Sequence, residues 1–372
     1  LGVAAPNGVG ITEFSHAIKN GISGIRHDIK LEELQFSCQI AGKPEISEEL
    51  KAQYVTEVEL RGFSSTGILY GVIAGIEAWK NAGLPIETNE EPDWDSGIIF
   101  GSGTSGIDKF RESIYKIDEL QVRKLGSTVV AQTMNSGISA YLGGKLGLGN
   151  QITTNSSACS TGTEAILMAY DRIQSGQAKR ILAGSTGDSG PYIWGGFDAL
   201  RVCSSKYNDN PEQGSRPMSA SAAGFVPASG AGALVIEDLE SALERGAAIY
   251  AEILGGNINS GGQRGNGSMT APNSTAVQRC IINAINNSGI SANDIDAING
   301  HLTATTKDSL EIENWTKALN RKGNDFPFIN SLKSMTGHCL SAAGSIESIA
   351  AILQIHEGFI FGNINCDDIH TE

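Results

Sequence analysis

A segment around Cys159 constrains the fold of this chain more than any other feature. Residues 155–164 are rich in small side chains, a β-prone run at 151–154 precedes them, and 164–173 carries apolar residues at helical spacing. The pattern predicts a strand, a sharp turn and a helix, with the Cys159 sulfur at the helix N-terminus. There the macrodipole favours a thiolate, and free N–H groups can bind an oxyanion. From these residues alone, a small buried core cysteine is an equally good interpretation.

Two histidines follow strand-like segments in the last quarter of the chain. Residues 294–300 have the composition of a strand that ends at His301, and residues 326–332 form a similar segment before His338. A small-residue helix is expected over 341–353. Because catalytic groups in α/β sheets gather at the carboxyl ends of strands, the two histidines and Cys159 indicate a Cys–His–His site.

Several segments resemble the β-ketoacyl-acyl-carrier-protein synthases, the elongating condensing enzymes that share the thiolase fold. These segments lie at 2–8, 155–162, 195–199, 216–217, 224–232 and 333–344, so the resemblance runs along nearly the whole chain. It implies an α/β fold of five layers, αβαβα, in two pseudo-repeated halves. We place the halves at residues 1–238 and 239–372, with a strand at 230–237 closing the first and one at 248–254 opening the second. The family is normally homodimeric.

The resemblance also implies roles for individual residues. Cys159 matches the acylated nucleophile, His301 and His338 match two active-site histidines, and Lys333 matches a lysine whose charge helps to hold the site in order. The remaining matches are a supporting network (Asp308, Glu311, Glu347), substrate-binding residues (Thr303, Thr305, Thr270, Phe197, and Thr104 beside the acyl tunnel) and cations that dock the carrier (Arg123, Lys124, Arg201, Arg61).

The implied reaction is a decarboxylative Claisen condensation with acyl carrier protein as the partner, in fatty-acid or related polyene or polyketide synthesis. It needs no metal and no organic cofactor. A degradative thiolase would use a second cysteine where this chain has His338. The alternative from another class is a catalytically silent, chain-length-factor-like subunit, against which the retained Cys159, His301, Lys333 and His338 argue.

The chain departs from the family pattern at a few positions. Leu302 stands where the family normally has Gly, and the interval from His301 to Asp308 is one residue short, which questions the roles of Asp308 and Glu311. Residues 219–222, Ser-Ala-Ser-Ala, replace a charged stretch, so we expect local ion pairing to be lost there. Both ends look trimmed, because the chain opens at Leu1 without an initiating Met and without the strand that normally precedes residues 2–8, and because the family's final Gly-Phe-Gly-Gly segment is missing.

The composition of the chain limits which partners and which cell compartment we expect. A net charge of −14 argues against nucleic acid, and it requires a local basic patch if an acidic carrier is to dock. The six cysteines form no CxxC pair or metal-ligand spacing, which is typical of reduced thiols. Neither a signal peptide nor an apolar run long enough to cross a membrane is apparent, so we expect a cytoplasmic enzyme that does not insert into membranes.

Overall fold

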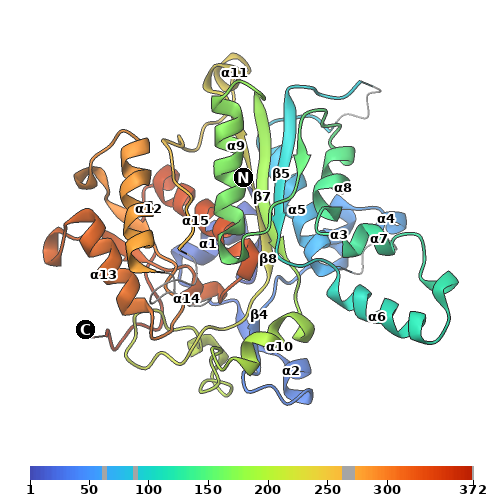
Figure 1. Cartoon of the computed structure of the whole chain (residues 1–372), viewed down its shortest axis with the longest axis horizontal. Helices are drawn as coiled ribbons and strands as arrows, with labels where there is room; N and C mark the ends of the chain where they lie inside the picture. The colour runs from blue at the N-terminus through green and yellow to red at the C-terminus, as the bar shows by residue number, and fades with distance from the viewer. Residues whose placement is uncertain (61–64, 87–90, 262–272, 371–372) are drawn as a thin grey trace.

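The computed structural model describes residues 1–60, 65–86, 91–261 and 273–370. A six-stranded sheet lies at its centre, in the order β2-β1-β8-β7-β5-β6 (Figure 1). Strand β5 is parallel to β6 and β7, whereas β8 is antiparallel to both β7 and β1. The strands are β1 (Gly2–Ala5), β2 (Gly8–Val9), β5 (Ser96–Ser102), β6 (Ile152–Thr153), β7 (Arg180–Gly187) and β8 (Gly230–Glu237). The strand predicted at 230–237 is therefore confirmed.

Helices cover both faces of this sheet. The long apolar helix α5 (Thr66–Asn81) and α8 (Gly137–Lys145) pack on one face, where Ile73 and Phe100 are fully buried. Helices α9 (Thr161–Gln174) and α15 (Ala343–Glu357) pack on the other face and against each other. The helices predicted at 164–173 and 341–353 are these two. Burying such Ile and Phe side chains stabilises the fold by about 1.5–3 kcal/mol each.

A smaller sheet lies beyond α9 and α15. Strands β9 (Ala297–Asn299) and β10 (Phe328–Asn330) pair in parallel. Helices α12 (Ser274–Asn287) and α13 (Asp308–Leu319) pack together over them and lie at the left of Figure 1. The order helix, sheet, helix, sheet, helix confirms the αβαβα arrangement. The strand expected at 248–254 was wrong, because these residues pair with no strand in the described part of the chain. Tyr250 and Ile253 instead pack their side chains on the core.

The remaining elements surround these layers. They are α1 (Ile11–Lys19), β3 (Ile25–His27), α2 (Ile29–Glu33), β4 (Ile40–Gly42), α3 (Glu48–Tyr54), α4 (Glu57–Leu60), α6 (Ile107–Asp118), η1 (Val122–Lys124), α7 (Val129–Thr133), α10 (Pro191–Ala199), η3 (Pro211–Gln213), α11 (Leu239–Glu244), η4 (Ala292–Asp294) and η5 (Gly323–Asp325). No helix in the described ranges is both long enough and apolar enough to cross a membrane.

The two middle helices begin in the same way. A short turn, η2 (Ala158–Ser160), precedes α9, while α14 (Lys333–Thr336) and η6 (Leu340–Ala342) precede α15. Each of η2 and η6 starts at a residue in the left-handed region, with φ of 50° at Ala158 and 49° at Leu340. The helices then cross at Gly162, where a Cβ would lie 2.3 Å from the Ser345 nitrogen. This close crossing brings the starts of both helices to one place.

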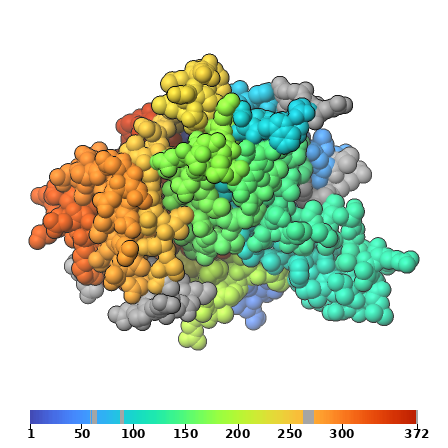
Figure 2. All heavy atoms as spheres, turned by 45° about the horizontal axis from the view of Figure 1, so that its top comes forward, coloured from blue at the N-terminus to red at the C-terminus, as the bar shows by residue number. Residues whose placement is uncertain are grey.

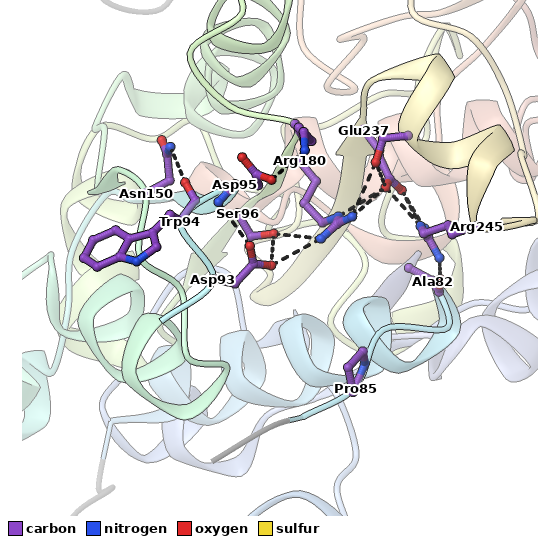
Figure 3. Close-up of polar contacts among 12 residues, drawn as sticks. Ala82, Pro85, Asp93, Trp94, Asp95, Ser96, Asn150, Arg180, Glu237 and Arg245 are labelled. Atoms are coloured by element: carbon purple, nitrogen blue, oxygen red, sulfur yellow. Dashed lines mark hydrogen bonds and ion pairs between the residues drawn. The ribbon is translucent and has the colours of Figure 1, made fainter. Parts of the chain in front are cut away.

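An ion-pair network ties the sheet at its opposite end (Figure 3). Arg180 at the start of β7 donates to Glu237 at the end of β8 (3.0 Å) and to Asp93 (3.2 Å), and Arg245 also donates to Glu237. Burial raises the pKa of Glu237, but hydrogen bonds from Arg245, Ser241 and Arg180 outweigh it and hold that pKa below its usual value. The network lies away from the carboxyl ends of β5, β6 and β7.

Candidate active site

The turn that carries Cys159 is fixed by a buried threonine. The hydroxyl of Thr161 accepts from the Ser157 N–H (2.8 Å) and donates to the Ala158 carbonyl (2.6 Å). These bonds hold Ala158 in the left-handed region, a conformation that costs about 1–3 kcal/mol for a residue with a side chain and occurs often at functional sites. The predicted strand–turn–helix is confirmed, with a 3₁₀ turn between strand and helix.

The structure brings Cys159, His301 and His338 together. The Cys159 sulfur lies 3.1 Å from Nε2 of His338, and the two imidazole rings meet edge to face with centroids 5.2 Å apart. One ligand atom from each residue lies within 4.8 Å of the others. Sulfur and imidazole nitrogen are ligand atoms that zinc also accepts. The three side chains come from η2, from the loop after β9 and from the loop after α14.

Burial and a nearby cation set the protonation states of both imidazoles. His338 is 3% exposed, and burial, Lys333 and His301 lower its pKa well below the usual value. His301 keeps contact with solvent, yet desolvation by the protein around its ring and the charge of Lys333 lower its pKa to about 3. Both rings are therefore neutral near pH 7, so each can donate one N–H to a substrate oxygen.

Cys159 is a thiol at rest, contrary to the thiolate expected from its place at a helix N-terminus. Burial raises the pKa of the Cys159 thiol, and the positive charge of Lys333 offsets only part of this effect. The expectation failed because it counted the helix dipole without the cost of placing a charge in a poorly solvated site.

Lys333 is the buried cation that acts on the whole site. It is 1% exposed, and its ammonium group donates to the Glu347 carboxylate on α15. Burial raises the pKa of Glu347, while Lys333 lowers it. We interpret the close contact as a salt bridge, since an unpaired charge at this depth would be strongly destabilising.

Two carboxylates on α13 hold the loop that carries His301. Glu311 accepts from the backbone N–H groups of His301 (2.6 Å) and Leu302 (2.8 Å). Asp308 accepts from the N–H of Thr303 (2.9 Å) and from three other backbone N–H groups, those of Ala304, Thr305 and Met218. The shorter interval between His301 and Asp308 thus leaves both carboxylates bonded to the loop.

The threonines of this loop lie beside each other. The hydroxyls of Thr303 and Thr305 are 3.1 Å apart, and both side chains are partly exposed. Ala304 between them has φ of 61° and is buried, and its carbonyl accepts from the Gly224 N–H (2.9 Å). Thr270, the third threonine expected to bind substrate, lies outside the described residues.

An aromatic side chain that the sequence analysis did not single out supports His338. The Phe225 ring contacts His338 edge-on with centroids 5.2 Å apart, and Phe197 contacts Phe225 in the same way at 5.5 Å. The backbone N–H of His338 also donates to Val226 (2.8 Å). The only signal for Phe225 was its place in the family-like segment 224–232.

Residues 219–222 carry no charge of their own, but a carboxylate from a distant segment binds beside them. Arg216 pairs with Asp368 at 3.4 Å, and Asp368 also accepts from the Ser219 hydroxyl and from the Ser221 N–H (3.0 Å). The segment that ends the described chain therefore supplies the carboxylate that the loop itself lacks. Local sequence could not reveal this, because Asp368 is 152 positions from Arg216.

The residues expected to bind the carrier and the acyl chain are exposed or lie outside the described part of the chain. Arg123 and Lys124 are exposed on η1, and Arg201 is exposed directly after α10 with φ of 57°. Thr104 lies exposed in the loop after β5. Arg61 lies outside the described residues.

Comparison with known proteins identifies the family. The family model for the Beta-ketoacyl synthase, N-terminal domain, matches residues 1–242, and that for the C-terminal domain matches residues 250–367. The chain is 33% identical to 3-oxoacyl-[acyl-carrier-protein] synthase I, chloroplastic, of Arabidopsis thaliana, over 82% of this chain and 67% of that protein. It is 31% identical to 3-oxoacyl-[acyl-carrier-protein] synthase 1 of Escherichia coli, over 100% of this chain and 88% of that protein.

Solved structures give the same result. A β-ketoacyl synthase from Burkholderia phymatum superposes with a TM-score of 0.89 at 27% identity, covering 100% of this chain and 88% of that one. A type II polyketide ketosynthase in complex with its acyl-carrier protein superposes with a TM-score of 0.86 at 28% identity and the same coverage. With the Cys–His–His arrangement in a thiolase-like fold, these matches show that the chain belongs to the β-ketoacyl synthase family of condensing enzymes.

Proposed function

We propose that this chain transfers an acyl group to Cys159 and condenses it, with loss of CO₂, with malonyl-acyl-carrier protein to give a β-ketoacyl-carrier product. The observation that carries the proposal is the meeting of one thiol and two neutral imidazoles beside the buried Lys333. Neutral imidazoles suit hydrogen-bond donation to an enolate better than a pair of charged rings packed edge to face would.

The first half-reaction loads the enzyme. The Cys159 sulfur attacks the acyl thioester carbonyl, a new C–S bond forms, and the carrier thiol departs with the proton that Cys159 gives up. His338 Nε2 lies 3.1 Å from the sulfur, close enough to donate its N–H to the thiolate as it forms. The backbone N–H of Cys159, in the turn η2 just before α9, favours the charged sulfur and can donate to the oxyanion that forms on the attacked carbonyl.

The second half-reaction forms the carbon–carbon bond. The bond between the malonyl carboxylate and its methylene carbon breaks, CO₂ leaves, and the electron pair becomes an enolate whose oxygen accepts from His301 and His338. The methylene carbon then attacks the acyl carbonyl on Cys159. The C–S bond breaks, and the sulfur leaves as a thiolate that takes a proton from water. Lys333 assists because its charge offsets part of the cost of the thiolate.

The alternative is a catalytically silent, chain-length-factor-like subunit, which Leu302 in the His301 loop would favour. Against it, Glu311 still binds the backbone of both His301 and Leu302, and no substitution removes Cys159, His338 or Lys333. A silent subunit would have no need of a thiol aligned with an imidazole. We therefore prefer the enzyme.

We propose acyl carrier protein as the macromolecular partner. The chain has a net charge of −14, so an acidic carrier needs a local positive surface, and exposed Arg123, Lys124 and Arg201 offer one. The similar ketosynthase named above was solved with its own acyl-carrier protein.

We also propose that two copies form a homodimer through the edge of the large sheet. Strand β6 is the outer strand of that sheet, and its Ile152 is 43% exposed. Figure 2 shows the neighbouring segment with α6 and α7 (teal) standing out from the body of the molecule. Its large apolar side chains are exposed, among them Phe110, Ile114, Leu120, Val130 and Met134. Apolar surface of this extent marks an interaction site on a soluble protein.

The free cysteines support a location in the reducing cytoplasm.

The test is a reconstituted assay with purified components. The wild-type protein is incubated with acyl-carrier protein loaded with a medium-chain acyl group, and the Cys159 peptide is examined by mass spectrometry. Malonyl-carrier is then added and the β-ketoacyl product is quantified. We expect acylation of Cys159 followed by product formation. The absence of both acylation and product would support the silent-subunit alternative, and acylation at another residue would reject the assigned nucleophile.

A further inference from the structure

Gly300 and Leu302, on either side of His301, share one small space. A Cβ atom at position 300 would lie 2.9 Å from Leu302 Cγ, 3.0 Å from Leu302 Cδ1 and 3.2 Å from Glu311 Oε1. Such distances are shorter than ordinary van der Waals contact. The Leu302 side chain is fully buried, with 0% exposure, so it has no open space into which it could move.

The backbone around this pair is also fixed. The Leu302 N–H donates to Glu311 (2.8 Å), and the Leu302 carbonyl accepts from the buried Ser331 hydroxyl (2.8 Å). The Gly300 N–H donates to Asn330 on β10 (2.8 Å). The φ angle of Gly300 lies outside the left-handed region, so glycine is not required there by the backbone conformation. Position 300 requires glycine because there is no room for a Cβ atom, not because of the backbone conformation.

The same carboxylate connects the pair to the catalytic loop. Glu311 Oε1, which a Cβ at position 300 would press against, is the oxygen that accepts from the His301 N–H at 2.6 Å. A side chain at position 300 would therefore displace Leu302, the Glu311 carboxylate or both. Either shift would alter the place of the His301 ring, whose centroid lies 5.2 Å from that of His338.

We propose that Gly300 and Leu302 are a coupled pair that positions His301, with the Leu302 side chain filling the space that the absent side chain of residue 300 leaves. Leu302 is then compatible with activity even though the family normally has Gly at this place. The effect of this pair on the rate of CO₂ release rests on the proposed condensing function. The effect of the pair on the melting temperature does not.

The test is a double-mutant cycle with Gly300→Ala, Leu302→Ala and the two combined. Gly144→Ala is the matched control, because a Cβ at that exposed helical glycine would meet no atom within 4 Å. Each protein is assayed for its melting temperature, for acylation of Cys159 and for CO₂ release from malonyl-carrier. We expect Gly300→Ala to lower the melting temperature and to slow CO₂ release about tenfold or more, with acylation changed less than twofold. Leu302→Ala should show the same pattern more weakly.

The double variant decides the matter. Since alanine at 302 vacates the space that a Cβ at 300 needs, the double variant should melt higher and release CO₂ faster than Gly300→Ala. Additive losses, or an equal loss of acylation and CO₂ release, would overturn the proposal. If Gly300→Ala does not fold, the double variant is compared with Leu302→Ala instead. The two should have the same melting temperature and the same rate of CO₂ release, and lower values in the double variant would reject the coupling. If the wild type does not condense at all, the melting temperatures still report the coupling.

Discussion

The Cys159 sulfur lies 3.1 Å from His338 Nε2, although the two residues are 179 positions apart in the sequence. Each is held by its own backbone contacts: Thr161 fixes the turn around Cys159, and the Val226 carbonyl binds the His338 N–H. The crossing of α9 and α15 at Gly162 then sets the distance between the two turns. The crossing of the two helices thus places the Cys159–His338 pair, and the loop after β9 adds His301.

The raised pKa of the Cys159 thiol predicts how its alkylation depends on pH. Because the thiolate reacts, the rate of iodoacetamide labelling at Cys159 should keep rising above pH 8 rather than level off near neutral pH. Lys333→Ala should shift this profile to higher pH, because the Lys333 cation favours the thiolate. Lys179→Ala serves as the control, because this exposed lysine lies just before β7 and pairs with Asp95. Peptide mass spectrometry measures the rates, and a plateau at neutral pH would contradict the assignment.

Carrier docking predicts a salt-dependent effect of charge. Reversing Arg123 and Lys124 to Glu should raise KM for acyl-carrier substrate by about 5- to 10-fold at low ionic strength and by less at high salt, because salt screens exposed charges. Activity towards a small acyl thioester without a carrier should stay the same. Lys317→Glu, at an exposed lysine on α13, is the control. Equal losses on both substrates would mean that the pair supports the fold instead.

The position of Thr104 predicts a change in acyl chain length. If the acyl tunnel reaches this loop where two copies meet, Thr104→Gly should lengthen the accepted primers and Thr104→Phe should shorten them. Each extra buried methylene is worth only about 0.8 kcal/mol, whereas overpacking costs about 1–3 kcal/mol, so the limit should be sharp. Product lengths are measured by mass spectrometry. Identical distributions for the wild type and both variants would show that Thr104 does not line the tunnel.

The network in Figure 3 predicts a loss of stability without a loss of catalysis. Arg245→Met removes one partner of the Glu237 carboxylate and should lower the free energy of unfolding by about 1–3 kcal/mol at pH 7. The folded pKa of Glu237 is lowered, so its contribution is present above the unfolded pKa and is lost as the pH falls through the folded one. Thermal melts should therefore converge for the two proteins in acid. A variant that lost condensation while keeping its stability would disprove a purely structural role.

Local pattern was sufficient wherever one segment carried its own signal. The apolar run at 230–237 became β8, and the small-residue segment after 151–154 became the Cys159 turn. It was insufficient wherever the partner is distant. Residues 248–254 look like a strand, but pairing depends on a neighbour elsewhere in the chain. Asp368 beside Arg216 and Phe225 beside His338 are likewise contacts between distant parts of the sequence, and the burial that keeps Cys159 protonated also depends on them.

The most direct measurement of the central claim separates the two halves of the reaction in Cys159→Gln. This variant removes the nucleophile but leaves His301 and His338, to which we assign enolate formation. It should release CO₂ from malonyl-carrier at a rate comparable to or above that of the wild type, while making no β-ketoacyl product. In the same background, His338→Ala should abolish CO₂ release. If Cys159→Gln still condenses, or if CO₂ release survives the loss of His338, the roles assigned to these residues are wrong.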